Sequence, residues 1–296
     1  MIERLRRGVG GLDPHLVNSA FVYDEAKRAE LAAICGQYLQ IGRDSGLPLI
    51  LSTPTWRASR ERVEAGGCAD RDVNGDNFRF LNALRSGCGS YAHQVLVCGL
   101  MSCRGNAYEP AEARPAAEAR EFHAWQAGRL AAAGVDFLMA ATLPALSEAR
   151  GLAAALAATG SEYVVSFIIR PEGTLLDGTP LKEAVAAIDA DTRPRPTAFM
   201  VNCTHASFFE AALRHRRHSS AQTRARVVGL LANTAPLNPE ELDESPELVA
   251  EAPEVFARSL AALHRELGMK ILGGCCGTDE RHIRCLASRL KGEGGE

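Results

Sequence analysis

The 296-residue sequence has no hydrophobic run long enough to span a bilayer, and its first residues lack the apolar stretch of a secretory signal peptide. Its charges nearly cancel, with 33 Lys and Arg against 36 Asp and Glu and a formal net charge of −3. That balance gives no basic surface for nucleic acid or for an anionic membrane. No internal repeat or low-complexity linker divides the chain. These absences predict a single cytoplasmic domain over residues 1–296, which we expect to be a monomer or homodimer.

Nine cysteines in a chain without a secretory signal are typical of free thiols and ligands rather than of a disulfide framework. Cys275 and Cys276 follow a short apolar run and two glycines, and the helix-like segment Asp279–Leu286 comes next. Adjacent cysteines bridge each other only with strain. Soft thiolate sulfur selects zinc, and a catalytic zinc has three protein ligands and one open position. The pattern of strand, glycine turn and helix therefore favours a metal site that needs a third ligand.

Cys203 supplies the third candidate ligand. It ends a second apolar strand, Pro196–Val201, and is followed by the helix-like segment Phe208–Leu213. In a barrel of parallel strands the carboxyl ends converge on one face, where active sites are built. Alone, Cys203 would be interpreted as a small buried hydrophobe. The remaining cysteines considered lack ligand-like spacing and are interpreted as buried or incidental thiols: Cys68, Cys88, Cys98, Cys103 and Cys285.

Seven apolar strands alternate with helices, which indicates parallel pairing through right-handed crossovers. This order favours a barrel over an open doubly wound sheet. Thr179 is predicted to cap the helix that Pro180 opens, and the loop Leu100–Pro115 is long enough to be functional. Ile2–Gly8 has the pattern of a short helix end with no strand ahead of it, so a first strand is expected to be missing. The predicted strands are 47–51, 94–99, 135–140, 163–169, 196–203, 227–231 and 269–272.

Val201–His205 and Gly273–Thr278 resemble the two zinc motifs of the homocysteine S-methyltransferase family, and the resemblance extends from about Gly8 to Leu290. Supporting segments are Leu51–Ser59, Glu118–Gln126, Ala131–Leu138, Ser166–Phe167, Leu176–Thr179 and Leu242–Glu244. The resemblance implies a TIM-type (β/α)8 barrel with zinc on Cys203, Cys275 and Cys276. It also implies methyl transfer to homocysteine or a related thiol, giving methionine or a thioether. The implied donors are S-methylmethionine, S-adenosylmethionine or betaine.

The chemistry of three thiolates agrees with that activity. Zinc held by three anionic sulfurs is a poor Lewis acid for hydrolysis, but it lets an incoming thiol lose its proton and remain nucleophilic. Held against a methylated sulfonium or ammonium, that sulfur displaces the methyl group in line. The three cysteines are thus expected to be catalytic through zinc. The residues expected to contact substrate are Thr53, Trp56, Thr142, Asn202 and Asn233.

Two departures from the family pattern concern the thiol acceptor. Ala141 stands where the resemblance places a glutamate that holds the amino group of homocysteine, and the family's acidic residue near the N-terminus has no counterpart. An unpaired substrate ammonium would be strongly disfavoured in a buried site. The acceptor is therefore a thiol without an amino-acid end, or it is recognised by other groups such as Arg57, Arg104 or Asn233.

Two other functions stay open. A zinc-binding barrel without catalysis would serve as a binding or regulatory protein. A dithiol oxidoreductase that used Cys275 and Cys276 is disfavoured, because adjacent cysteines form strained, readily reduced bonds. Among the histidines, His205 is interpreted as orienting a ligand or facing solvent, and His282 as a helix-surface residue. His215 and His218 are assigned to a solvated basic face.

Overall fold

The computed structural model describes residues 5, 11–215, 217–237 and 250–293 of the chain. Its strands are β1 (Leu49–Ser52), β2 (Val95–Ser102), β3 (Phe137–Leu143), β4 (Tyr163–Phe167), β5 (Ala198–His205), β6 (Val227–Asn233) and β7 (Ile271–Gly274). Its α-helices are α2 (Glu25–Ser45), α3 (Arg60–Ala65), α4 (Val73–Ser86), α5 (Ala116–Ala133), α6 (Leu146–Ala157), α7 (Leu181–Asp191), α8 (Ala206–Arg214), α9 (Ala221–Arg226), α11 (Pro253–Leu267) and α12 (Glu280–Glu293). Short 3-10 helices are η1 (Ser19–Tyr23), η2 (Gly89–Gln94) and η3 (Pro110–Glu112).

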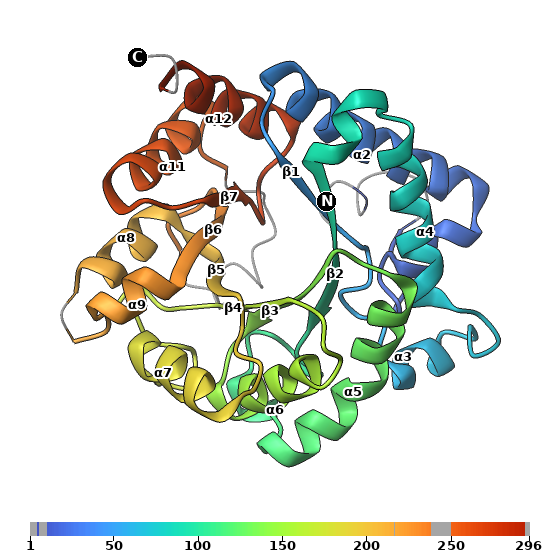
Figure 1. The fold of residues 1–296 in the computed structure, drawn as a ribbon, viewed down its shortest axis with the longest axis horizontal. Helices are drawn as coiled ribbons and strands as arrows, with labels where there is room; N and C mark the ends of the chain where they lie inside the picture. The colour runs from blue at the N-terminus through green and yellow to red at the C-terminus, as the bar shows by residue number, and fades with distance from the viewer. Residues whose placement is uncertain (1–4, 6–10, 216, 238–249, 294–296) are drawn as a thin grey trace.

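The strands form one parallel sheet in the order β1-β2-β3-β4-β5-β6-β7, curled inside a ring of helices (Figure 1). Within the described ranges, no strand pairs with the outer edge of β1 or of β7. The helix layer closes where the sheet does not, because α12 packs on α2 and Lys291 Nζ donates to the carbonyl oxygen of Asp44 at 3.3 Å. The prediction of a TIM-type barrel with its first strand missing is confirmed. No helix in the described part of the chain is long and apolar enough to cross a membrane.

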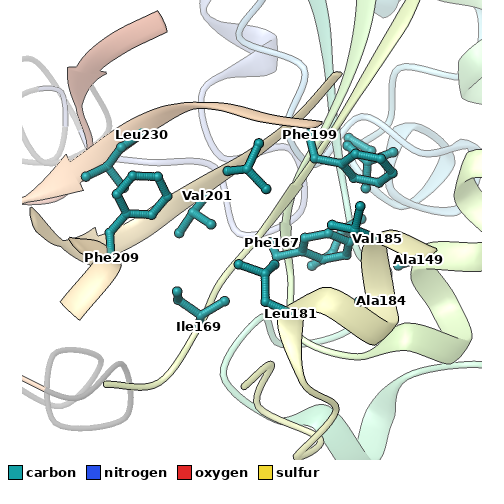
Figure 2. Close-up of a cluster of buried hydrophobic side chains, with 14 of the residues drawn as sticks. Ala149, Phe167, Ile169, Leu181, Ala184, Val185, Phe199, Val201, Phe209 and Leu230 are labelled. Atoms are coloured by element: carbon teal, nitrogen blue, oxygen red, sulfur yellow. The ribbon is translucent and has the colours of Figure 1, made fainter. Parts of the chain in front are cut away.

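Alternation along each strand divides the core into two layers. On β3, Leu138 and Ala140 pack in the large cluster between the sheet and the helices, whereas Met139 and Ala141 belong to a smaller cluster on the opposite side of the sheet. In the outer layer the rings of Phe167 and Phe199 stack with centroids 6.0 Å apart (Figure 2). The central strands β3 and β4 are therefore buried on both sides, as parallel strands in a barrel are.

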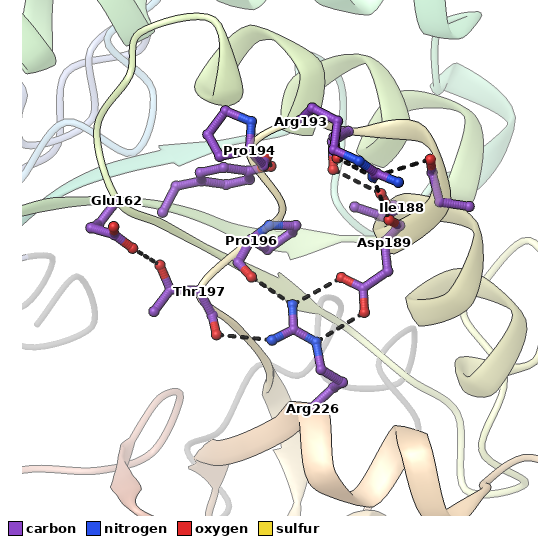
Figure 3. Close-up of polar contacts among 11 residues, drawn as sticks. Glu162, Ile188, Asp189, Arg193, Pro194, Pro196, Thr197 and Arg226 are labelled. Carbon is purple, nitrogen blue, oxygen red and sulfur yellow. Dashed lines mark hydrogen bonds and ion pairs between the residues drawn. The ribbon is translucent and has the colours of Figure 1, made fainter.

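A polar brace joins elements at the amino ends of β5 and β6. The guanidinium of Arg226, at the end of α9, binds both carboxylate oxygens of Asp189 at 2.9 Å and the carbonyl oxygens of Pro196 and Thr197 (Figure 3). Asp189 is 5% exposed, so the pair is largely removed from water. Arginine suits this arrangement, because its planar guanidinium offers five N–H donors that can bind a carboxylate with two nitrogens and carbonyl oxygens with the rest. This end of the barrel is built for stability and lies opposite the end where the cysteine-bearing strands finish.

The predicted strands all exist, with ends displaced by a few residues. The predicted cap of α7 was wrong, because Pro180 and not Thr179 precedes its first residue and no side chain caps it. Thr179 is held instead in a small hairpin, where its carbonyl oxygen accepts from the Leu175 N–H at 2.8 Å. Helix α3 was not predicted, since six residues are too few to show a clear period. Of Ile2–Gly8, only Leu5 lies within the described residues, and it is helical and buried.

Candidate metal centre

Three cysteine sulfurs converge at the carboxyl end of the barrel. The Sγ atoms of Cys203, Cys275 and Cys276 all lie within 4.8 Å of one another, and those of Cys203 and Cys275 are 2.8 Å apart. Cys203 lies near the carboxyl end of β5, whereas the other two cysteines directly follow β7. The expected meeting of these three residues is thus found in the structure.

The backbone at Cys203 is unusual. Cys203 has φ 51° and Thr142, on β3, has φ 59°, both in the left-handed region that L-residues rarely occupy. The strand register shifts at each of these positions. Such bulges re-aim a side chain next to an active site. At β5 the bulge directs the Cys203 sulfur toward the turn that carries Cys275.

Asn202 holds these two bulges together. Its Oδ1 accepts hydrogen bonds from the Thr142 N–H at 2.8 Å and from the Ser166 hydroxyl at 2.7 Å, and its Nδ2 donates to Thr142 Oγ1 at 2.7 Å. All three residues are buried. A fully satisfied buried network of this kind specifies one arrangement. Contact of Asn202 and Thr142 with substrate stays a prediction.

The end of β6 holds the turn that carries the other two cysteines. The Cys275 N–H donates to the Ala232 carbonyl at 2.7 Å, and the Cys276 N–H donates to Asn233 Oδ1 at 3.1 Å. Glycine is required at position 274, because a Cβ there would lie 2.3 Å from Thr278 Oγ1. Asn233 thus lies beside the cluster, as expected, and its buried Nδ2 has no hydrogen-bond partner among the described residues.

The thiols share charge within the cluster. Hydrogen bonds from Cys203 and Cys276 hold the pKa of Cys275 well below its usual range. The same contacts, together with burial, raise the pKa of Cys203. The pKa of Cys276 rises to about 12, since its contact with Cys275 and its burial outweigh the lowering effect of Cys203.

The arrangement fits a thiolate-bound metal. Zinc–sulfur bonds of about 2.3 Å in a tetrahedron place ligand sulfurs roughly 3.8 Å apart. The three sulfurs here lie within 4.8 Å of one another, and the pair at 2.8 Å would have to open by about 1 Å to reach that spacing. Three ligands leave a fourth position for another group. The shell beside Cys203 is apolar, formed by Ile168, Leu176 and Tyr108.

Two histidines lie near the cluster. His205 Nδ1 is 2.8 Å from Ser207 Oγ, and its Nε2 is 3.7 Å from a carboxylate oxygen of Glu251. The prediction for His282 was wrong, because its side chain is only 2% exposed. Its Nδ1 lies 2.9 Å from Asp279 Oδ1 and its Nε2 lies 3.2 Å from the Glu251 carbonyl oxygen. His282 therefore joins the start of α12 to the segment before α11.

The other candidate residues make contacts of their own. Thr53 is buried, shares a 2.6 Å hydrogen bond with Thr55 and accepts from the Leu100 N–H, whereas Trp56 lies under the guanidinium of Arg57. His215 is exposed as predicted, but His218 is half-buried. None of the six remaining cysteines joins the cluster; Cys285 is half-buried, and the others are buried: Cys35, Cys68, Cys88, Cys98 and Cys103.

Comparisons with known proteins agree on one family. A model described as homocysteine S-methyltransferase matches residues 2–290. The homocysteine S-methyltransferase of Escherichia coli is 30% identical over 175 residues, which are 57% of this chain and 52% of that protein. Betaine–homocysteine S-methyltransferase 1 of Bos taurus is 28% identical over 173 residues, 54% of this chain and 41% of that one. The chain spans about half the length of the curated relatives it matches.

Solved structures share the fold. The homocysteine methyltransferase MmuM from Escherichia coli, in its metallated form, superposes with a TM-score of 0.75 at 22% identity, covering 98% of this chain and 93% of that one. Its oxidised form gives the same TM-score, and its apo form gives 0.65. The sheet order and helix ring described above are therefore those of an established barrel.

Proposed function

The chain belongs to the homocysteine S-methyltransferase family, and on that premise we propose that it moves a methyl group from a sulfonium or ammonium donor to a zinc-bound thiol. The acceptor is homocysteine or a related thiol, and the product is methionine or a thioether. S-methylmethionine, S-adenosylmethionine and betaine represent the donor class. The single observation that carries the proposal is the convergence of three sulfurs from two distant strand ends.

Cys203, Cys275 and Cys276 are the residues that we propose as zinc ligands. Thiolate donors select zinc over hard cations, and three of them leave one open position. Zinc bound there would supply a site at which an incoming thiol loses its proton and remains nucleophilic. The chain's own thiolates add negative charge, which favours approach of a positively charged methyl donor.

Apolar side chains shield the Cys203 sulfur from water. Ile168 and Leu176 are fully buried or nearly so and pack against Cys203. Apolar surroundings that exclude water strengthen the attraction between an anionic sulfur and a cationic donor, because the local dielectric is low. Asn202 and Asn233 orient the ligands, one through the bulge at Cys203 and the other through the Cys276 N–H.

The test begins with metal content. Protein purified without chelator is expected to hold about one zinc per chain, as three-cysteine catalytic sites do. Cys203→Ser should remove most of that zinc, whereas Cys285→Ser, a half-buried cysteine outside the cluster, should leave it unchanged. Zinc retained at the normal level in Cys203→Ser would refute the ligand set.

Turnover is measured next, with S-methylmethionine as donor and a panel of thiols that includes homocysteine. Methylation of any of these thiols, lost in Cys203→Ser, supports the proposal. Homocysteine is expected to react poorly if its amino group needs a partner at position 141. Ala141 lies in an apolar cluster with Cys98, Met139 and Met200 and offers no charge. Zinc binding without turnover of any thiol would favour the alternative, a barrel that binds zinc and serves as a binding or regulatory protein.

A further inference from the structure

Arg57 lies five residues beyond the end of β1, at the carboxyl end of the barrel where the cysteines also lie. Its Nη1 donates to the carbonyl oxygens of Arg104 and Gly105, at 3.0 and 2.6 Å. The face of its guanidinium rests on Trp56, with 4.4 Å between Cζ and the ring centroid. The side chain is therefore fixed by two neutral acceptors and an aromatic ring, none of which neutralises its charge.

No carboxylate among the described residues lies within the 4.0 Å ion-pair distance of Arg57. Two acidic groups are nearby, but both accept backbone hydrogen bonds, Glu148 from the Arg104 N–H and Glu112 from the Asn106 N–H, each at 2.7 Å. Glu148 also lies 2.9 Å from His123 Nε2. Burial lowers the pKa of Arg57, which agrees with an arginine that lacks a full counter-charge.

The other two groups that could recognise the acceptor offer no free charged fork; the Nδ2 of Asn233 has no described partner but is neutral. Arg104 pairs with Glu61, its Nε lying 3.1 Å from the carboxylate, and its guanidinium lies over Phe122. Asn233 uses its Oδ1 on the Cys276 N–H. Of the two arginines, Arg57 keeps its Nε–Nη2 fork without a described partner, whereas Arg104 uses the same two nitrogens on Glu61.

The loop that Arg57 holds leads to the metal centre. Arg104 and Gly105 belong to the segment after β2, and Tyr108 of the same segment packs against Ile168, Leu176 and Cys203. Arg57 and the cluster thus contact neighbouring parts of the same segment. A substrate whose sulfur reaches the cysteines would pass along this loop.

We propose that Arg57 binds a carboxylate of the thiol acceptor and so makes the enzyme selective for thiol acids. Guanidinium forks hold carboxylates through two parallel hydrogen bonds, and a partly desolvated one without a partner gains most from doing so. The inference rests on the proposed function, because it concerns the acceptor of that reaction. No covalent step is added: Arg57 would position the carboxylate of the acceptor, while the acceptor's sulfur would take the open coordination position on the zinc.

Three thiols test the inference in zinc-loaded protein by titration calorimetry. Mercaptobutanoate keeps the carboxylate of homocysteine without its amine, aminopropanethiol keeps the amine without the carboxylate, and butanethiol has neither. Wild-type protein is expected to prefer mercaptobutanoate. Arg57→Gln should lower the affinity for mercaptobutanoate by about tenfold to a hundredfold, the range for a charged hydrogen bond. The affinity for butanethiol should stay unchanged.

Two further variants separate charge from loop support. Arg57→Lys keeps the charge but not the fork, so it should retain part of the preference for mercaptobutanoate. Arg60→Gln removes an exposed arginine, paired with Glu64, from the next helix and should change nothing. If Arg57→Gln lowered the affinity for mercaptobutanoate and for butanethiol equally, Arg57 would only support the loop, and the inference would be overturned.

The outcomes also separate this inference from the proposed function. Thiols that bind the zinc protein with no preference for the acid overturn the role of Arg57 alone. A wild-type protein that retains zinc but binds none of the three thiols overturns the proposed function and the inference together.

Discussion

Cys203 and Thr142 hold backbone conformations that cost about 1–3 kcal/mol each for residues of their kind. Such strain persists only where the surroundings determine the conformation, and here the surroundings are largely one side chain. The amide of Asn202 makes three hydrogen bonds to Thr142 and Ser166. The position of the Cys203 sulfur therefore depends on a neighbour that does not touch the metal.

Asn202→Ala tests this dependence. The change leaves the buried Thr142 N–H and Ser166 hydroxyl unpaired, so unfolding should become easier by about 2–4 kcal/mol. Zinc affinity should fall as well, because the bulge that aims Cys203 loses its support. Urea unfolding and competition with a chromophoric chelator measure the two effects.

Asn77→Ala is the matched control. Asn77 is also buried and donates to two carbonyl oxygens, of Ser19 and Val73, but in a different part of the chain. It should lower stability and leave zinc affinity unchanged. Equal zinc affinity in wild type and Asn202→Ala would mean that the cluster is positioned by β7 alone.

The sequence was sufficient to predict that these three cysteines meet, but not the geometry that joins them. Glycines and paired thiols at strand ends have a chemical signature, so Cys203, Cys275 and Cys276 could be recognised one motif at a time. The left-handed conformation of Cys203 has no such signature, since glycine is the residue that normally indicates it. His282 was misassigned because a histidine among charged residues predicts a solvated surface. Only the folded chain brings its ring against Asp279 Oδ1 and the Glu251 carbonyl oxygen.

Asp279 makes stability depend on pH at the start of α12. Although burial raises its pKa, hydrogen bonds from Arg281 and His282 outweigh that effect and lower it well below the usual range. A carboxylate with a depressed pKa stabilises the fold above its unfolded pKa of about 3.9 and loses that contribution as pH falls further. Asp279→Asn should therefore be less stable than wild type at pH values near neutral, with the difference shrinking below about pH 4. Urea midpoints at several pH values measure this, and a constant difference would contradict it.

At the scale of elements, helices α5 and α6 pack closely because one contact has no side chain. A Cβ on Gly151 of α6 would lie 2.2 Å from the Ala116 carbonyl oxygen and 2.6 Å from the Ala119 Cβ. The approach is a backbone contact, so nothing can rotate away. This is a role for glycine that a helical pattern hides, since an isolated glycine in a helix otherwise only weakens it.

Gly151→Ala should force α5 and α6 apart and destabilise the protein by about 1–3 kcal/mol. Gly128→Ala is the control within the same pair, because Gly128 lies inside α5 and a Cβ there meets nothing within 4 Å. That change should stabilise the protein by about 0.5–1 kcal/mol through helix propensity. Thermal unfolding of both variants decides the matter, and a shift of the same sign in both would contradict the packing argument.

The alternation of elements was readable from apolar runs, because strands buried on both faces are nearly continuous in Val, Ile, Leu and Ala. Helix starts were less readable. Thr179 followed by Pro180 is a typical helix opening, yet Leu175 binds the Thr179 carbonyl and keeps that residue in a hairpin. A hydrogen bond to the preceding loop overrides the local signal there, and one sequence alone does not reveal such a bond.

For the whole molecule, the helices close into a ring while the sheet has two edges. The four residues of β7 are all half-buried, whereas β3 and β4 are buried throughout. In a parallel sheet each strand sends half of its N–H groups to each side. Half of the amides of β1 and β7 therefore have no strand partner among the residues that the structure describes. One of these edges, β7, leads directly into Cys275 and Cys276, so the ordering of the site and the ordering of that edge are linked.

Hydrogen exchange should resolve that link. Amides of β3, β4 and β5 are expected to exchange slowest, close to the rate of global unfolding, and those of β1 and β7 markedly faster, because opening an edge strand disturbs fewer contacts. Zinc should slow exchange in β7 more than in β1, since Cys275 and Cys276 follow β7 directly and the ion would tie them to Cys203 of β5. Cys203→Ser measured with the same amount of zinc serves as the control and should show no such slowing. Protection of β1 and β7 equal to that of β4 would mean that both edges are covered in solution, and the metal would then have little left to order.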